Sequence, residues 1–278
     1  MINFKVEGAI FDIDDTLLDN KSSNPETALH ERARLVAVHE IGKRHSIQKL
    51  IELSIQDNSN AFLNAPVHTL EAAVWEIFLM TGVADSRAIN STHPLLKEIV
   101  TIKDKLYKDI LLHEGEEVPG AVAFVRALAI SGVDKLAIAS TAIRRDIDIF
   151  LMKTGLKPLF PEYRIKSKES TTHPKPNPEI FNIAFISLNI LEQMRGQVCA
   201  FEDDPRGVMA AKSAGLFTCA ITTRFSKDFL LSREAPPDLV AESFQEFAEY
   251  FDIKDAFNSF NKPEIGSNYR ANRDASGL

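Results

Sequence analysis

A short apolar run that ends in two closely spaced carboxylates constrains this chain more than any other feature. Residues 9–16 read Ala-Ile-Phe-Asp-Ile-Asp-Asp-Thr, so Asp12 and Asp14 directly follow a segment with the pattern of a buried strand. Like charges repel one another, and burial beside a hydrophobic core penalises both ionised forms. The folded chain must therefore bring a cation to the end of this strand.

Two other structures use a similar pattern. A calcium loop of the EF-hand type also begins with alternating acids, but it requires Gly at its sixth position and Glu at its twelfth. Those positions hold Leu17 and Ser23. The plain structural alternative is an Asp-rich turn in which Asp15 and Thr16 cap the next helix. Residues farther along the chain disfavour that alternative.

Three later segments place polar groups after apolar runs or in rigid loops. Residues 136–140, Leu-Ala-Ile-Ala-Ser, end in the hydroxyl of Ser140. Lys175 stands in the proline-rich segment His-Pro-Lys-Pro-Asn-Pro. Residues 198–204 run from an apolar stretch into three consecutive acids, and a segment rich in small residues follows as far as Leu216.

These segments, in this order, resemble the four motifs of the haloacid dehalogenase superfamily, and the resemblance spans residues 8 to 223. Most members of that superfamily hydrolyse phosphate esters through an aspartyl-phosphate. The branch that this chain resembles includes phosphoglycolate phosphatases and β-phosphoglucomutases. The resemblance implies an α/β fold with a doubly wound parallel sheet and an inserted helical cap domain.

The chemistry of the residues suits that interpretation. Asp12 is the expected nucleophile, because an ionised carboxylate can attack phosphorus and divide one difficult displacement into two easier ones. Asp14 can reach the leaving oxygen, so we expect it to act as general acid in the first step and as general base toward water in the second.

Both carboxylates are expected to work around one Mg²⁺, a hard ion that takes oxygen ligands. The expected ligands are the Asp12 carboxylate, the backbone carbonyl of Asp14 and Asp203. Side chains expected to support these ligands are Thr16, Glu202 and Asp204. For Asp204, capping of the helix that begins near Pro205 is the favoured role over metal ligation.

Phosphoryl transfer also requires groups that neutralise the phosphoryl oxygens. Ser140 is expected to donate a hydrogen bond to them. The backbone N–H groups of Thr141 and Ala142, opening the next helix, would add anion-binding donors. Lys175 is expected to hold the phosphate and the nucleophile together.

Composition is consistent with this interpretation. The 278 residues carry a net charge of −7 and are 45% hydrophobic, enough for one core and an accessory domain. The acidic balance argues against nucleic acid as a partner, and no apolar run is long enough to span a membrane. We therefore expect a cytoplasmic protein, and the resemblance implies a small phosphorylated metabolite as its binding partner. Cys199 and Cys219 are expected to be buried free thiols.

Strand and helix patterns alternate along most of the chain, as in a parallel sheet covered on both faces. Motifs one, two and four would end strands at the edge where open α/β sheets bind ligands. The predicted strands cover residues 8–11, 135–139, 198–201, 218–221 and 238–241, with an edge strand at 163–165.

Between residues 18 and 117 the strand-like runs give way to helical patterns. The predicted helices cover residues 25–45, 48–63, 69–81 and 94–112. This insertion is expected to be a cap domain, residues 18–117, joined by linkers at 17–24 and 113–119, that closes over the site. The core domain would comprise residues 1–17 and 118–257, and residues 258–278 are expected to be disordered.

Polar residues of the cap are expected to lie on its surface rather than to contact a ligand. Those considered are His30, Arg32, Arg34, Lys43 and His45, and the same holds for Arg144, Arg145 and Arg206. Trp75 and Phe78 are expected to pack inside the cap.

The leading prediction is a Mg²⁺-dependent phosphatase of a small phosphorylated metabolite such as a phosphosugar or phosphoglycolate. A sugar phosphomutase of the β-phosphoglucomutase type is the alternative that uses the same motifs. Phosphonate cleavage would need a cap lysine that forms a Schiff base, for which Lys43 and Lys49 are available. Haloacid dehalogenation is disfavoured because Asp14 is present, and a non-catalytic binding or regulatory protein is disfavoured because all four motif residues are intact.

Overall fold

The computed structural model describes residues 2–67 and 69–261, and its centre is a sheet of six parallel strands. The strand order is β5-β4-β1-β6-β7-β8. Their bounds are β1 Gly8–Phe11, β4 Leu136–Ala139, β5 Ile165–Lys166, β6 Val198–Glu202, β7 Phe217–Ile221 and β8 Leu239–Ala241. The predicted doubly wound α/β fold is confirmed, and each predicted strand is present within two residues of its expected bounds.

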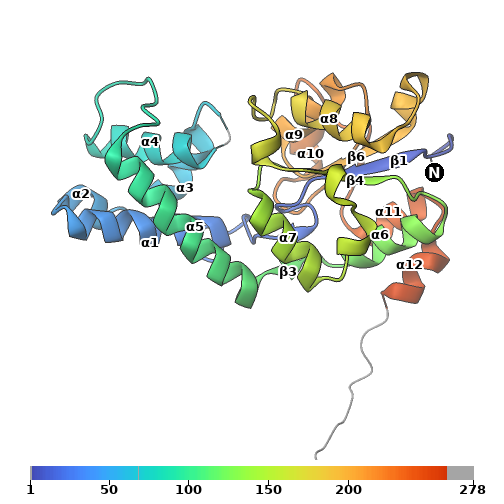
Figure 1. The fold of residues 1–278 in the computed structure, drawn as a ribbon, viewed down its shortest axis with the longest axis horizontal. Coiled ribbons are helices and arrows are strands. Elements are labelled where there is room, and N and C mark those ends of the chain that lie inside the picture. The colour runs from blue at the N-terminus through green and yellow to red at the C-terminus, as the bar shows by residue number, and fades with distance from the viewer. Residues whose placement is uncertain (1, 68, 262–278) are drawn as a thin grey trace, which may run out of the picture.

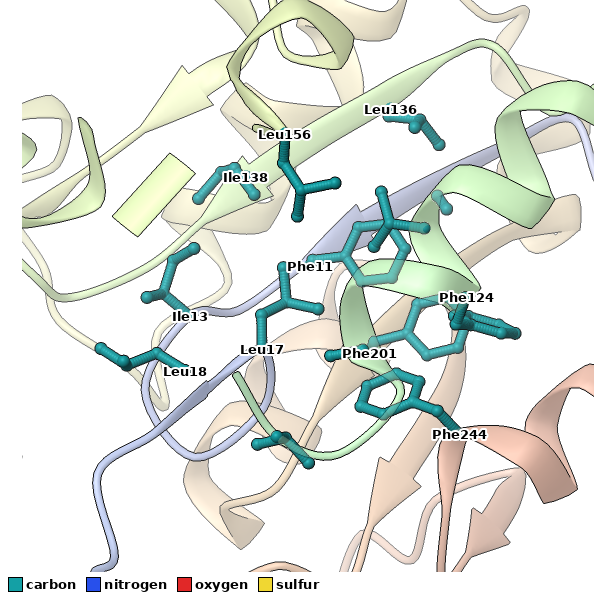
Figure 2. Close-up of a cluster of buried hydrophobic side chains, with 14 of the residues drawn as sticks. Phe11, Ile13, Leu17, Leu18, Phe124, Leu136, Ile138, Leu156, Phe201 and Phe244 are labelled. Atoms are coloured by element: carbon teal, nitrogen blue, oxygen red, sulfur yellow. The ribbon is translucent and has the colours of Figure 1, made fainter. Parts of the chain in front are cut away.

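Side chains of the central strands alternate between two cores, as the period of two along a strand requires. In β1, Phe11 packs in the larger core and Ile10 in the smaller one on the opposite face. Phe11 stacks on Phe201 of β6 with ring centroids 4.7 Å apart. Figure 2 shows these rings with Phe124 and Phe244 in the larger core. The first strand is therefore buried on both faces, which fixes the position of the residues that follow it.

Helices cover both faces of the sheet (Figure 1). On the face of the smaller core lie α8 Glu179–Leu188, α9 Pro205–Ser213 and α10 Lys227–Leu231. The opposite face is covered by α6 Ala121–Ile130, α7 Arg144–Lys153, α11 Phe244–Tyr250 and α12 Lys254–Phe260. Short 3₁₀ turns occupy Lys157–Leu159, Glu162–Arg164, Lys168–Ser170 and Glu192–Gln197.

The chain between β1 and β4 forms a separate group of helices, which lies beside the sheet in Figure 1. These helices are α1 Leu29–Arg44, α2 Gln48–Ile51, α3 Ile55–Asn64, α4 Leu70–Thr81 and α5 Pro94–Glu114. They enclose a hydrophobic core of their own, in which Trp75 and Phe78 pack as predicted. The division of the chain into cap and core at residues 17/18 and 117/118 stays a prediction.

The single helix predicted over residues 48–63 is wrong. Two helices are present, because Ser54 adopts an extended conformation and its side chain accepts the Asp57 N–H at 3.0 Å, which starts α3. The first helix also begins at Leu29 rather than at residue 25. In both places, side chains and turns set a boundary that hydrophobic periodicity alone does not show.

Strand structure also occurs in the insertion, contrary to the prediction. Strand β2 Leu18–Asp19 pairs antiparallel with β3 Glu116–Glu117, so the two linkers contact each other where the helical insertion leaves and rejoins the core. The chain also stays helical to Phe260, which corrects the predicted start of disorder at residue 258. The remainder of that predicted tail, residues 262–278, lies outside the described residues.

Both cysteines are buried free thiols on β6 and β7, as expected. Within residues 2–67 and 69–261, no helix is both long and apolar enough to cross a membrane.

Candidate active site

Three motif residues converge at the carboxyl end of the sheet. Asp12 follows β1, Ser140 follows β4 and Asp203 follows β6, and these strands are adjacent. Strand β1 pairs with β4 on one side and with β6 on the other. The three side chains therefore lie at the point where the strand order reverses, which is where open α/β sheets bind ligands.

Lys175 supplies the cation that the sequence requires at this point. Its ammonium group donates to Asp12 Oδ1 at 2.7 Å and to Glu202 Oε1 at 2.6 Å, and all three side chains are buried. Burial works to lower the pKa of Lys175, but the two carboxylates outweigh it and raise that pKa. Lys175 is thus held charged between the two acids, as a buried ion pair with good geometry must be.

Asp203 completes a compact acidic cluster. One oxygen from each of Asp12, Glu202 and Asp203 lies within 4.8 Å of the others. The Thr16 hydroxyl donates to Asp203 Oδ1 at 3.2 Å. Burial, followed by the nearby carboxylates, raises the pKa of Asp203 well above its usual range. Burial also raises the pKa of Glu202 to about 8, although Lys175 partly opposes that rise.

This cluster fits a hard divalent cation. Its donors are carboxylate oxygens, the ligands that Mg²⁺ takes in proteins, and Lys175 is paired with only two of the three acids. The raised pKa of Asp203 reflects negative charge that a bound cation would offset. The predicted assignment of Asp12, Asp14 and Asp203 as ligands stays a prediction.

Asp14 is held by two residues that the sequence analysis did not connect to it. Asn20 donates to Asp14 Oδ1 at 2.6 Å, and Nε2 of His30 lies 3.5 Å from Asp14 Oδ2. His30 in turn stacks on Tyr107 of α5, with ring centroids 3.8 Å apart. Burial would raise the pKa of Asp14, but His30 and the hydrogen bond from Asn20 lower it. The placement of His30 on the cap surface was therefore wrong.

The loop after β4 differs in part from the prediction. Thr141 and Ala142 line the cavity, but α7 begins only at Arg144, so they precede the helix rather than open it. The Ala142 N–H points to the Ser140 hydroxyl at 3.3 Å. Ser140 itself is buried beside the acidic cluster; burial raises the pKa of Asp12, and the Ser140 hydroxyl partly opposes that rise.

The acids flanking the two aspartate motifs have structural roles. Asp204 caps α9 by accepting the Arg206 N–H at 2.8 Å, which is the role the sequence favoured. Asp15 has a positive φ of 57° in a tight turn and accepts the Asn20 N–H at 3.1 Å. The alternative in which Asp15 and Thr16 cap a helix is wrong, because a turn and β2 follow them.

A cavity of about 300 Å³ extends from this cluster to the inserted helices. Helix α1 contributes Glu31 and Arg34, and α5 contributes Lys103. The placement of Arg34 on the surface was wrong, since it is 2% exposed and donates to Asn58 through Nε and Nη2, both at 2.8 Å. Arg32 is exposed and paired with Glu114, as a surface residue is expected to be. Lys43 and His45 also lie on the surface.

Several residues that line this cavity, or pack against its lining as Tyr107 does, had no sequence signal beyond helical periodicity. Glu31 and Arg34 share one face of α1 because they are three residues apart, and Lys103 and Tyr107 do so on α5 at a spacing of four. Such spacing could have grouped them. It could not have shown that these polar faces point toward the core, because that depends on how the inserted helices dock.

Substitution of Gly207 should disturb this site specifically. A methyl group at Gly207 of α9 would lie 2.1 Å from the Glu202 carboxyl carbon, so Glu202 must leave its position beside Lys175. We expect Gly207→Ala to lower the free energy of unfolding by about 1–3 kcal/mol, as overpacking does. Urea unfolding measures this.

Gly196→Ala is the matched control, because a methyl group there meets no described atom within 4 Å. It should change stability by no more than about 0.5 kcal/mol. Equal stability of the two variants would show that Glu202 is not fixed as described.

Comparisons with known proteins place the chain in one family. A family model described as haloacid dehalogenase-like hydrolase matches residues 6–215. The structure of a haloacid dehalogenase hydrolase of family IA, variant 3, from Entamoeba histolytica superposes with a TM-score of 0.68 at 22% identity, covering 91% of this chain and 99% of that one.

Two curated relatives match part of the chain. Glycerol-1-phosphate phosphohydrolase 2 of Saccharomyces cerevisiae is 30% identical over 148 residues, which cover 51% of this chain and 58% of that protein. The phosphorylated carbohydrates phosphatase of Thermotoga maritima is 31% identical over 136 residues, covering 44% and 59%. The chain thus spans somewhat more than half the length of these relatives.

Proposed function

Because this chain belongs to the haloacid dehalogenase-like hydrolase family, we propose that it is a Mg²⁺-dependent phosphatase of small phosphorylated metabolites. The observation that carries the proposal is the buried lysine that bridges Asp12 and Glu202 beside Asp203. This arrangement leaves one oxygen of Asp12 free of Lys175 and places positive charge beside it. The relatives named above, which act on glycerol-1-phosphate and on phosphorylated carbohydrates by their descriptions, support the same reaction class.

The first step transfers the phosphoryl group to Asp12. One carboxylate oxygen of Asp12 bonds to phosphorus, the bond from phosphorus to the ester oxygen breaks, and Asp14 gives its proton to the departing alcohol. Asn20 and His30 hold Asp14 in one orientation for this transfer. Because they also lower the pKa of Asp14, the negative charge of the bound phosphoryl group would have to raise that pKa for Asp14 to carry the proton that it donates. Lys175 and Ser140 are positioned to neutralise the phosphoryl oxygens.

The second step returns Asp12 to its carboxylate form. Asp14 takes a proton from water, the water oxygen bonds to phosphorus, and the bond to Asp12 breaks with release of inorganic phosphate. Asp12, Asp203 and the carbonyl of Asp14 would hold Mg²⁺, which when bound supplies positive charge that offsets the repulsion between substrate and carboxylates. The side chains of Thr16 and Glu202 would fix the orientation of these ligands.

We also propose that residues 18–117 act as a cap that covers the reacting groups. Contacts between the inserted helices and the core support this role: Lys168 pairs with Glu71 of α4 at 2.7 Å, and Arg145 of α7 donates to the Asp104 carbonyl of α5 at 2.9 Å. Closure of such a cap excludes water from the reaction.

Release of inorganic phosphate from a panel of phosphorylated metabolites, with Mg²⁺ or with EDTA, tests the proposal. We expect release with Mg²⁺ and a fall of about a hundredfold or more with EDTA, because a bound metal supplies several kcal/mol of transition-state stabilisation. Interconversion of sugar phosphates without release would favour the mutase alternative. Absence of both reactions would contradict the proposed enzyme.

A further inference from the structure

The part of the cavity formed by the inserted helices contains a buried carboxylate with one unbonded oxygen. Glu31 of α1 lines the cavity and is 4% exposed. Within the part of the chain that the structure describes, its Oε2 has no hydrogen-bond partner, and Arg34, three residues on, attracts the Glu31 carboxylate electrostatically without bonding to that oxygen. Buried carboxylates are normally paired, so this group has acceptor capacity for a bound molecule.

Two cationic residues of the inserted helices, Arg34 and Lys103, line the same cavity. The Lys103 ammonium group of α5 sits 4.3 Å from the centroid of the Tyr107 ring and 3.8 Å from Asp104 Oδ1, which is too far for a hydrogen bond. Arg34 donates hydrogen bonds from Nε and Nη2 to Asn58. Lys103 makes no hydrogen bond with the described residues, so its donors are available to a bound molecule.

This mixture of groups matches hydroxyls better than a second anion. A hydroxyl donates one hydrogen bond and accepts others, whereas a carboxylate or phosphate only accepts. Glu31 can therefore accept from a hydroxyl while Lys103 donates to it. A second anion that contacted Glu31 directly would meet its negative charge, and like charges in contact in a buried site oppose binding.

We propose that Glu31 and Lys103 form a subsite for hydroxyl groups of the alcohol half of the ester, and that Glu31 is a specificity-determining residue. The substrate class is then phosphate monoesters of polyols or sugars, in preference to carboxylated esters such as phosphoglycolate. This inference rests on the proposed phosphatase function.

The test compares kcat/KM for glycerol 1-phosphate, n-propyl phosphate and phosphoglycolate in the full-length protein with Mg²⁺. Wild type should prefer glycerol 1-phosphate over each of the others by about tenfold or more, because a site built to bond a hydroxyl rejects analogues that lack it. Glu31→Gln should reduce the preference over phosphoglycolate by about tenfold, since it removes the charge and little volume. Lys103→Met should reduce the preference for glycerol 1-phosphate over n-propyl phosphate, since it removes a donor to the hydroxyl groups that n-propyl phosphate lacks.

Ratios of kcat/KM cancel any effect on the chemical step that all three esters share. Glu40→Gln is the matched control, because Glu40 lies on the outer face of α1 in an exposed ion pair with Arg44. It should leave both ratios at their wild-type values. Thermal unfolding shows whether each variant is folded, and if Glu31→Gln is not, the Lys103→Met ratio decides.

The failures are distinguishable. Phosphate release with ratios that do not change in Glu31→Gln and Lys103→Met would overturn the subsite and leave the phosphatase intact. If neither these three esters nor any other phosphate ester released phosphate, the phosphatase and the subsite would both be overturned.

Discussion

Replacing Asp12 by Asn is expected to lower kcat by at least about a thousandfold, a loss typical of removing the nucleophile of a covalent mechanism. An amide is a poor nucleophile toward phosphorus and a weaker metal ligand than a carboxylate. The change preserves the shape of the side chain. The loss of activity should therefore not come from loss of the fold, and steady-state phosphate release measures it.

The surroundings of Asp12 indicate that the variant stays folded. Asp12 carries a raised pKa, of which burial is the main cause, so neutralising it removes a charge that the interior disfavours. Lys175 keeps its hydrogen bond to Glu202 at 2.6 Å. Asp109→Asn, an exposed substitution on α5, is the matched control and should keep wild-type activity. Activity of Asp12→Asn nearly equal to that of wild type would exclude Asp12 as nucleophile.

Replacing Lys175 by Met is expected to lower the free energy of unfolding by about 3–5 kcal/mol, because it leaves two buried carboxylates without their cation. Asp12 and Glu202 both lose a hydrogen bond of 2.6–2.7 Å, and few other described groups can replace it. Urea unfolding in EDTA measures this loss without a contribution from metal. Lys5→Met is the control and should change stability little, because the Lys5 side chain is exposed at its ion pair with Glu7.

The stability lost in Lys175→Met should increase as pH rises. The pKa of Glu202 is about 8 in the folded protein, above its ordinary value of 4.5, so the folded state binds its proton more tightly than the unfolded state does. Such a group contributes stability that is lost as pH rises through the folded pKa. Without Lys175 the ionised carboxylates are less stable still, so the difference between variant and wild type should be larger at pH 8 than at pH 5.5.

A double substitution separates charge from packing. Adding Glu202→Gln to Lys175→Met removes one of the two uncompensated charges, so part of the lost stability should return. A double variant less stable than Lys175→Met would show that packing around the lysine stem, rather than charge, accounts for the loss.

The core of the site could be predicted from the sequence because its signals are local. Asp12, Ser140 and Asp203 each follow an apolar run long enough for a strand, and parallel strands bring such positions to one edge of a sheet. Lys175 could be placed because its proline-rich segment resembles the family's third motif and stands between the second and the fourth. In these cases a residue type and its neighbours along the chain determine where the side chain lies.

The remainder depends on tertiary contacts that leave no local pattern. Charged residues surround α1, so periodicity did not indicate that Glu31 and Arg34 face inward, and docking against α5 and the core determines that face. The break at Ser54 depends on one side-chain hydrogen bond. Thr141 and Ala142 were predicted to open a helix, but the turn after β4 delays α7 to Arg144.

Chemical trapping of the phosphorylated enzyme tests the central claim most directly. Borohydride reduces an acyl phosphate to an alcohol, so the protein quenched with it during turnover should contain homoserine in place of aspartate at position 12. Peptide mass spectrometry locates that change, and Asp109 in the same digest serves as the unreacted reference. Reduction at another carboxylate, or release of phosphate with no reduction at Asp12, would contradict the proposed mechanism.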